Sequence, residues 1–140
     1  MTTIPDVQPA LKAAVEQSIA ELRTAYGDEE TRIAPDGQGG AWVEIASVDL
    51  GETYLQDDTF VAFLLPFNLP GADIYPLFVR PDLGRTDGEP LGKGTQVTTL
   101  AWPGEQRRVV QLSRRTRNGA FASQTVVQKI EKVLAWLRDK

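Results

Sequence analysis

The sequence predicts an α+β domain in which an N-terminal helix, an antiparallel meander sheet with an added hairpin, and a C-terminal helix follow one another. Two segments, one near each end, carry apolar residues at spacings of three and four, as amphipathic helices do. Between them, short apolar or alternating runs are separated by turns rich in glycine and proline, which is typical of strands. The 140 residues correspond to a single domain spanning residues 1–140.

The first helix is predicted over Pro9–Tyr26, because Pro9 suits a first-turn position and Gly27 suits the stop. Its apolar stripe comprises Leu11, Ala14, Val15, Ile19 and Leu22. The last helix is expected to begin after Ser123, whose hydroxyl can cap it, and Trp136 is expected to flank its stripe. That stripe comprises Val126, Val127, Ile130, Val133, Leu134 and Leu137.

Strands are expected throughout the middle of the chain. The first four predicted strands are Thr31–Ala34, Ala41–Leu50, Thr59–Pro66 and Tyr75–Arg80. We expect the run GETYLQDD (residues 51–58) to form a tight turn, and Pro81–Gly94 to form a long surface loop. Thr95–Trp102 and Arg107–Arg114 are then expected to pair as a hairpin joined by Pro103–Gln106.

Composition excludes whole classes of chemistry. The chain has no cysteine and no histidine, so disulfides, thiolate–zinc sites, thiol nucleophiles and histidine bases are all excluded. The run DGEPLGKGT (residues 87–95) has glycines spaced one residue too closely for a phosphate-binding loop. The adjacent Asp57 and Asp58 are better explained as turn residues than as a catalytic pair. We therefore expect no catalytic residue, no cofactor and no metal ion.

Hydropathy and charge bear on location and partners. No run of about 18 apolar residues is present, and the N-terminus lacks the basic and apolar regions of a secretory signal, so a cytoplasmic protein without a membrane partner is expected. The net charge is −4. Residues 1–80 carry 13 acidic and 4 basic side chains, whereas residues 81–140 carry 6 acidic and 11 basic ones. Such an asymmetry marks either a partner surface or an ordinary solvated face.

Prolines interrupt the apolar stretch FLLPFNLPGADIYPLFVRPDL (residues 63–83), and proline ends strands because it cannot donate to a ladder. The passage TYLQDDTFVAFLLPFNLPGADIYPLFVRPDL (residues 53–83) resembles the ubiquitin-conjugating-enzyme family, in which a meander strand runs into a proline-rich connection and then another strand. Tyr54 matches the aromatic residue in the turn before the first of these strands. Pro66 and Pro70 match the prolines that follow it, and Tyr75–Pro81 matches the next strand and its exit. The resemblance covers most of Pro9–Arg80 and the final helix, and it implies the fold of that family.

The chain differs from this family at the residues that carry the family's catalytic chemistry. PDLGRTDG (residues 81–88) stands where the family has His-Pro-Asn, and the thioester-forming cysteine is missing, so thioester transfer by that mechanism is excluded. The run Ser113-Arg114-Arg115 is similar to the Ser-Arg-His triplet of a divergent bacterial branch, with Arg115 in place of the histidine. That branch is typically encoded beside a ubiquitin-like protein, an adenylyltransferase and a JAB-type peptidase. The resemblance therefore implies a bacterial small-protein modification pathway, with antiphage defence as one setting.

The resemblance also implies where partners bind. The exposed side of the first helix, with Lys12, Glu16 and Arg23, is expected to contact an activating enzyme, and the exposed face of the Trp42–Val48 strand is expected to contact a ubiquitin-like protein. The arginine strip is a further candidate for binding an acidic surface, phosphate or nucleic acid, or else it is simply solvated. We define this strip as Arg107, Arg108, Arg114, Arg115 and Arg117. Strand alternation predicts that Arg107 and Arg108 point to opposite faces.

The functional hypothesis is a non-catalytic ubiquitin-conjugating-enzyme-like protein that binds a ubiquitin-like protein or its activating enzyme. One alternative is an active conjugating enzyme whose cysteine has been replaced in this sequence, at Ser113, Ala101 or Ala120. Another is a nucleic-acid-binding module that uses the arginine strip. The sequence pI of about 4.8 and the lack of aromatic residues within the strip weigh against nucleic acid.

Overall fold

Residues 10–116 and 123–140 are described by the computed structural model, and within them two helices pack against one six-stranded sheet. In chain order the elements are α1 (Ala13–Tyr26), β1 (Thr31–Pro35), β2 (Ala41–Asp49), β3 (Asp58–Leu65), β4 (Leu77–Val79), β5 (Thr95–Trp102), β6 (Glu105–Leu112) and α2 (Val126–Arg138). The strand order is β1-β2-β3-β4-β6-β5, and every neighbouring pair is antiparallel. The predicted α+β order of helix, meander, hairpin and helix is confirmed.

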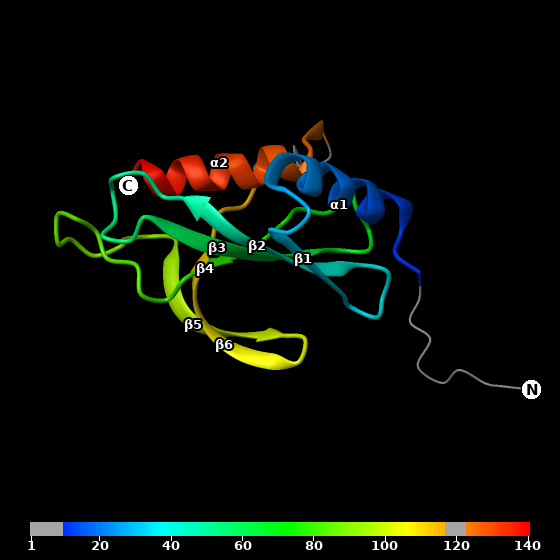
Figure 1. Cartoon of the computed structure of the whole chain (residues 1–140), viewed down its shortest axis with the longest axis horizontal. Helices are drawn as coiled ribbons and strands as arrows, with labels where there is room; N and C mark the ends of the chain where they lie inside the picture. Colours follow the sequence, from blue (N-terminus) through cyan, green and yellow to red (C-terminus); the bar gives the residue numbers. More distant parts are fainter. Residues whose placement is uncertain (1–9, 117–122) are drawn as a thin grey trace, which may run out of the picture.

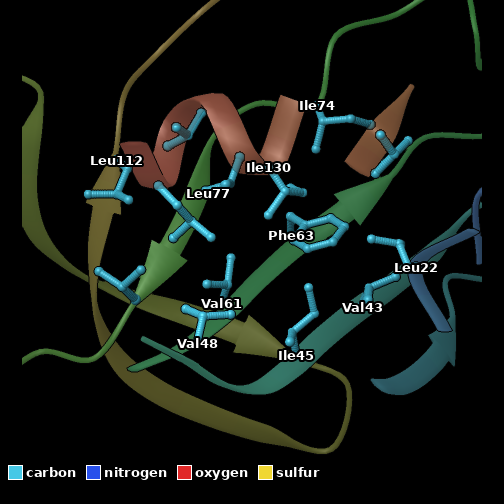
Figure 2. Close-up of a cluster of buried hydrophobic side chains, with 14 of the residues drawn as sticks. Leu22, Val43, Ile45, Val48, Val61, Phe63, Ile74, Leu77, Leu112 and Ile130 are labelled. Carbon is cyan, nitrogen blue, oxygen red and sulfur yellow. The ribbon is translucent and has the colours of Figure 1, made fainter. Parts of the chain in front are cut away.

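The main core lies between the sheet and the two helices, which cover the same face of the sheet (Figure 1). Figure 2 shows Phe63 of β3 pointing into this core among Leu22 of α1 and Ile130 of α2. All three side chains are fully buried. Because burying one such side chain stabilises the fold by roughly 1.5–3 kcal/mol, the stripes of both helices account for their position on the sheet.

The first helix is shorter than predicted at its start. It begins at Ala13, and Lys12 precedes it with extended backbone angles of φ −67° and ψ 151°. The Lys12 amide donates to the carbonyl oxygen of Gly39 at 3.0 Å, which holds the chain against the β1–β2 turn instead of in a helix. Pro9 lies outside the described residues. The predicted stop at Gly27 is confirmed, because Gly27 directly follows the last helical residue and its φ of 98° is a positive value that glycine adopts readily.

The last helix is capped by Thr125, so the prediction of Ser123 as the cap is wrong. The Thr125 hydroxyl accepts a hydrogen bond from the Gln128 amide at 3.1 Å, and the Gln128 side chain accepts one from the Thr125 amide at 2.8 Å. This reciprocal pair is a capping box, which satisfies two backbone donors that the helix itself cannot. The Thr-Val-Val-Gln spacing in the sequence is the signal for this start.

Prolines bound the strands of the crossover as expected. Pro66 follows β3 directly, and β4 spans only Leu77–Val79 of the predicted strand Tyr75–Arg80, between Pro76 and Pro81. The turn before β3 is not tight, however. Tyr54 within it is only 3% exposed, forms an isolated bridge with Arg85, and donates its hydroxyl hydrogen to the Leu137 carbonyl at 2.8 Å. Burial of this ring pulls the segment into the core.

The β5–β6 hairpin curls beneath the sheet and covers part of its outer face (Figure 1). Pro103 and Gly104 alone join the two strands, so β6 begins at Glu105, two residues earlier than predicted. The buried members of the resulting outer cluster are Ala62, Phe78, Leu100, Trp102 and Val109. The rings of Trp42 and Trp102 lie 6.2 Å apart between centroids, which joins the hairpin to β2.

Candidate functional site

Of the binding residues predicted on the first helix, Glu16 and Arg23 lie on the exposed side of α1, whereas Lys12 directly precedes the helix. Lys12, Glu16 and Arg23 are all exposed. Glu16 and Arg23 line a shallow groove of about 480 Å³ between α1 and Ile33 of β1. This face therefore presents both signs of charge around an apolar floor.

The outer face of Trp42–Val48, predicted to be an exposed partner surface, is covered where the hairpin packs on it, so this prediction is wrong for the middle of β2. Glu44 is only 7% exposed. Its carboxylate accepts hydrogen bonds from Arg107 Nη2 at 2.8 Å and from Arg32 Nη1 at 3.0 Å. The Arg107 guanidinium also lies over the Phe60 ring, 4.4 Å from its centroid. The hairpin covers this part of β2 because the Glu44 carboxylate binds two guanidinium groups and aromatic rings pack around them.

The arginine strip does not form one patch. Arg107 points to Glu44, whereas Arg108 is exposed on the opposite side of the hairpin, which confirms the predicted alternation. Arg114 and Arg115 lie beyond the end of β6, beside α2. Arg117 lies outside the described residues. Arg107 is therefore paired beneath the hairpin and Arg108 faces the other way, whereas Arg114 and Arg115 line the same pocket.

The Ser113-Arg114-Arg115 triplet lies where the chain leaves β6. The Arg114 guanidinium is 4.9 Å from the centroid of the Trp136 ring, and the Arg115 guanidinium is 4.0 Å from the centroid of the Tyr75 ring. Both arginines are exposed, so each presents its guanidinium to solvent from an aromatic support. Aromatic residues therefore do accompany these arginines, although they come from distant parts of the sequence.

A polar network lies beneath the triplet. Lys129 of α2 is 3% exposed, and its Nζ is 3.2 Å from Asp73 Oδ1 in the proline-rich crossover. Lys129 also donates to the Arg114 carbonyl at 2.7 Å and to Thr116 Oγ1 at 3.0 Å. Asp73 accepts two more hydrogen bonds, from the Thr116 amide at 2.8 Å and from the Thr116 hydroxyl at 2.9 Å. The network therefore ties the crossover and the exit of β6 to α2.

The electrostatics of the network follow from its enclosure. Burial opposes ionisation of Asp73, but the hydrogen bonds from Thr116 and the charge of Lys129 outweigh it and lower the pKa of the Asp73 carboxyl. Burial lowers the pKa of the Lys129 ammonium, and the nearby charges of Lys132 and Arg114 lower it further, against the opposing effect of Asp73. Burial is therefore the main reason that the pKa of this ammonium is lowered, and Asp73 offsets part of its effect.

Sequence reasoning missed this network. One signal was present: Lys129 is three residues after Val126 and four before Val133, so it occupies a core position of the final helix. A charged residue at such a position requires a buried partner. The identity of that partner could not be read from the sequence, because Asp73 is 56 positions away.

Two pockets flank Lys129. One, of about 320 Å³, lies between α1, the crossover and the start of α2, and Asp73 is among its lining residues. The other, of about 260 Å³, lies between the exit of β6 and α2. Its lining includes Arg114, Arg115, Thr116, Gln124, Lys132 and Trp136. This second pocket is basic, and two of the predicted binding residues, Arg114 and Arg115, line it together.

The Ser113 hydroxyl of the triplet is not paired with a base in the described structure. The Ser113 hydroxyl accepts a hydrogen bond from the Gln111 side-chain amide, which cannot take up a proton. Ala101 is exposed on β5, and Ala120 lies outside the described residues. Within residues 10–116 and 123–140, no three acidic side chains gather closely enough to hold a metal ion.

Comparisons with protein-family models, with curated proteins and with solved structures find no match to this chain. Neither of the helices in the described part of the chain is long and apolar enough to cross a membrane.

Proposed function

We propose that this chain is a non-catalytic member of the ubiquitin-conjugating-enzyme superfamily. In this proposal it binds a ubiquitin-like protein or its activating enzyme in a bacterial protein-modification pathway, in the cytoplasm. The absence of cysteine and histidine fits a protein that recognises a partner without forming a thioester. Antiphage defence is one setting for such a pathway.

The order of elements supports the proposal. A helix, an antiparallel meander, a proline-rich crossover after β3 and a final helix follow one another as the resemblance implies. The hairpin covers the middle of the outer face of β2, which removes one of the partner surfaces that the resemblance suggested. The exposed side of α1 and the Arg114–Arg115 end of the sheet remain.

The observation that carries the proposal is the presentation of Arg114 and Arg115. Both belong to the triplet that resembles the bacterial branch, both are exposed, and both guanidiniums rest on aromatic rings. A guanidinium held in this way retains its donors for a carboxylate while losing little conformational freedom on binding. An acidic surface of a partner protein is the matching chemistry.

The test is affinity capture from the native host, with bound proteins identified by mass spectrometry. Tagged wild-type protein is compared with Arg114→Glu/Arg115→Glu. The control is Arg108→Glu, which reverses the charge of an exposed base on the opposite side of the hairpin from Arg107. Recovery of a ubiquitin-like protein or an adenylyltransferase by wild type and control, and its loss from the first variant, is the expected result.

Other outcomes contradict the proposal. Recovery of nucleic acid in place of a modification-pathway protein would favour the nucleic-acid-binding alternative. Equal recovery of the partner by both variants would move the contact away from Arg114 and Arg115. A cysteine codon at position 101, 113 or 120 of the native gene would instead revive the active-enzyme alternative.

A further inference from the structure

We propose that the basic pocket between the exit of β6 and α2 binds a phosphate monoester. This proposal does not require a ubiquitin-like partner, because it stands on the shape and charge of the pocket itself. The pocket has a volume of about 260 Å³, and four basic side chains line it: Arg114, Arg115, Lys129 and Lys132. No carboxylate is among its described lining residues.

Three of these four positive charges lack an acidic partner. Lys129 is neutralised by Asp73, at 3.2 Å. In the described part of the chain, Arg114, Arg115 and Lys132 form no ion pair, and the intervening residues 117–122 contain no acidic residue in the sequence. Arg114 also lowers the pKa of the Lys140 ammonium, after the larger effects of burial and Arg85. An anion entering the pocket would relieve this mutual repulsion.

The cationic groups are already positioned. Trp136 supports Arg114 and Tyr75 supports Arg115, while Lys132 donates to the Gln124 side-chain oxygen at 3.0 Å. The Arg114 backbone is fixed in turn, because its carbonyl accepts a hydrogen bond from Lys129 at 2.7 Å. A pocket whose donors are held in place before binding spends little free energy on ordering them.

The charge of the pocket selects the class of anion. Three unpaired positive charges match the two negative charges of a phosphate monoester better than the single charge of a carboxylate. A nucleic-acid strand requires cations that follow a backbone path. Arg107 and Arg108 point away from the pocket and from each other, so no such path continues along β6. The concave site therefore favours a small monoester over a polymer.

The test is a titration of ¹⁵N-labelled protein with glycerol 3-phosphate at constant ionic strength, followed by NMR. Saturable shifts are expected for the Trp136 indole and the Gln124 side-chain amide. Arg114→Gln/Arg115→Gln is expected to weaken binding at least tenfold, and Lys132→Gln severalfold. The matched control, Arg23→Gln/Arg108→Gln, removes two exposed charges away from the pocket and is expected to bind glycerol 3-phosphate as wild type does. The spectra of the variants also report whether each one is folded.

Three results would overturn the proposal. If the control variant loses the chemical shift changes as completely as Arg114→Gln/Arg115→Gln does, the binding responds only to the overall charge of the protein. Acetate binding as tightly as glycerol 3-phosphate would remove the selectivity for a dianion. A single-stranded oligonucleotide that binds more tightly than the monoester, with equal losses in both double variants, would indicate a polymer on a broad surface. None of these results depends on the outcome of the capture experiment, so the two proposals can fail separately.

Discussion

The two faces of the sheet are closed by different interactions. On the helix-covered face, β3 contributes Phe63 and Leu65, which are fully buried among aliphatic side chains from both helices. On the outer face, the same strand contributes Phe60 and Leu64, which remain partly exposed. There the hairpin is held by aromatic rings, two arginines and the carboxylate of Glu44.

Two of the ion-pair arrangements, Lys129 with Asp73 beside α2 and Glu44 with Arg32 and Arg107 beneath the hairpin, differ in enclosure. The Lys129 side chain is 4% exposed and that of Asp73 is 14% exposed. Around Glu44, by contrast, the Arg32 side chain is 62% exposed and the Arg107 side chain is 20% exposed. Water screens the charges that it can reach, so removing one member of the enclosed pair should cost more stability than removing one member of the exposed pair. The comparison of the two faces teaches that buried aliphatic side chains supply most of the stability, whereas polar contacts fix how the segments are arranged.

The largest loss of stability is expected when a buried side chain on the helix-covered face is truncated. Phe63→Ala should lower the free energy of unfolding by about 3–5 kcal/mol, because the cavity it leaves is enclosed on all sides. Phe60→Ala, on the outer face of the same strand, should cost at most about half of that, since its ring is already partly exposed. Urea denaturation monitored by circular dichroism measures both. Equal losses would contradict the difference between the faces.

The next effect concerns the enclosed ion pair. Asp73→Asn should destabilise the protein by about 3 kcal/mol at pH 7, because it leaves the Lys129 ammonium without its carboxylate. The folded-state pKa of Asp73 is lowered, so its ionisation stabilises the fold above the unfolded-state pKa of about 3.9. This stabilisation is lost as the pH falls through the folded-state pKa.

The pH dependence separates Asp73 from a general effect of charge. Urea denaturation at pH 7, 5 and 3 measures the free energy of unfolding of wild type and of Asp73→Asn. The difference between the two free energies should become smaller at the lowest pH. The matched control is Asp57→Asn, at an exposed acid, which should follow wild type throughout. A constant difference between wild type and Asp73→Asn across this range would rule out the assigned role.

A smaller effect is expected at the outer ion pair. Glu44→Gln should cost about 1–2 kcal/mol, because water reaches Arg32 and part of Arg107. A double-mutant cycle with Arg107→Met should show a coupling of about 1 kcal/mol. The same cycle with Arg108→Met should show none, since Arg108 faces the other way. Coupling to Arg108 would mean that the hairpin does not lie as described.

The smallest effect tests the start of α2. Thr125→Ala should cost about 1 kcal/mol by removing the capping hydroxyl, whereas Thr125→Ser should be nearly neutral because serine keeps it. Thermal unfolding resolves a difference of this size in a domain of 140 residues. A larger loss in Thr125→Ser than in Thr125→Ala would contradict the capping role.

The helix-covered face is the part that the sequence predicts well. Residues such as Val15, Ile19 and Val133 recur with the period of a helix, and periodicity depends only on neighbours in the chain. The strands Ala41–Asp49 and Asp58–Leu65 were found within one residue at each end for the same reason. Glycine and proline marked most of the boundaries, because their backbone preferences are local.

The outer face and the polar network could not be predicted in this way. Alternation correctly separated Arg107 from Arg108, but it could not show that Glu44 would lie beneath Arg107, which is 63 positions away. It also predicted an open face on β2, because nothing in a single strand records which distant hairpin will cover it. Which residues contact each other when they are far apart in the sequence depends on the curvature of the sheet, and this curvature is a property of the whole fold.

The contact between Tyr54 and α2 has a consequence for synthesis on the ribosome. The Tyr54 hydroxyl binds the Leu137 carbonyl, and the neighbouring Thr53 hydroxyl binds that of Arg138, so the turn before β3 closes on the last turn of the final helix. A nascent chain that has completed β4 must therefore wait for α2 before either contact can form. At translation rates of about 5–20 residues per second, the part of the meander that α2 covers stays open for several seconds. During that interval the growing chain offers a surface for chaperones that the finished protein conceals.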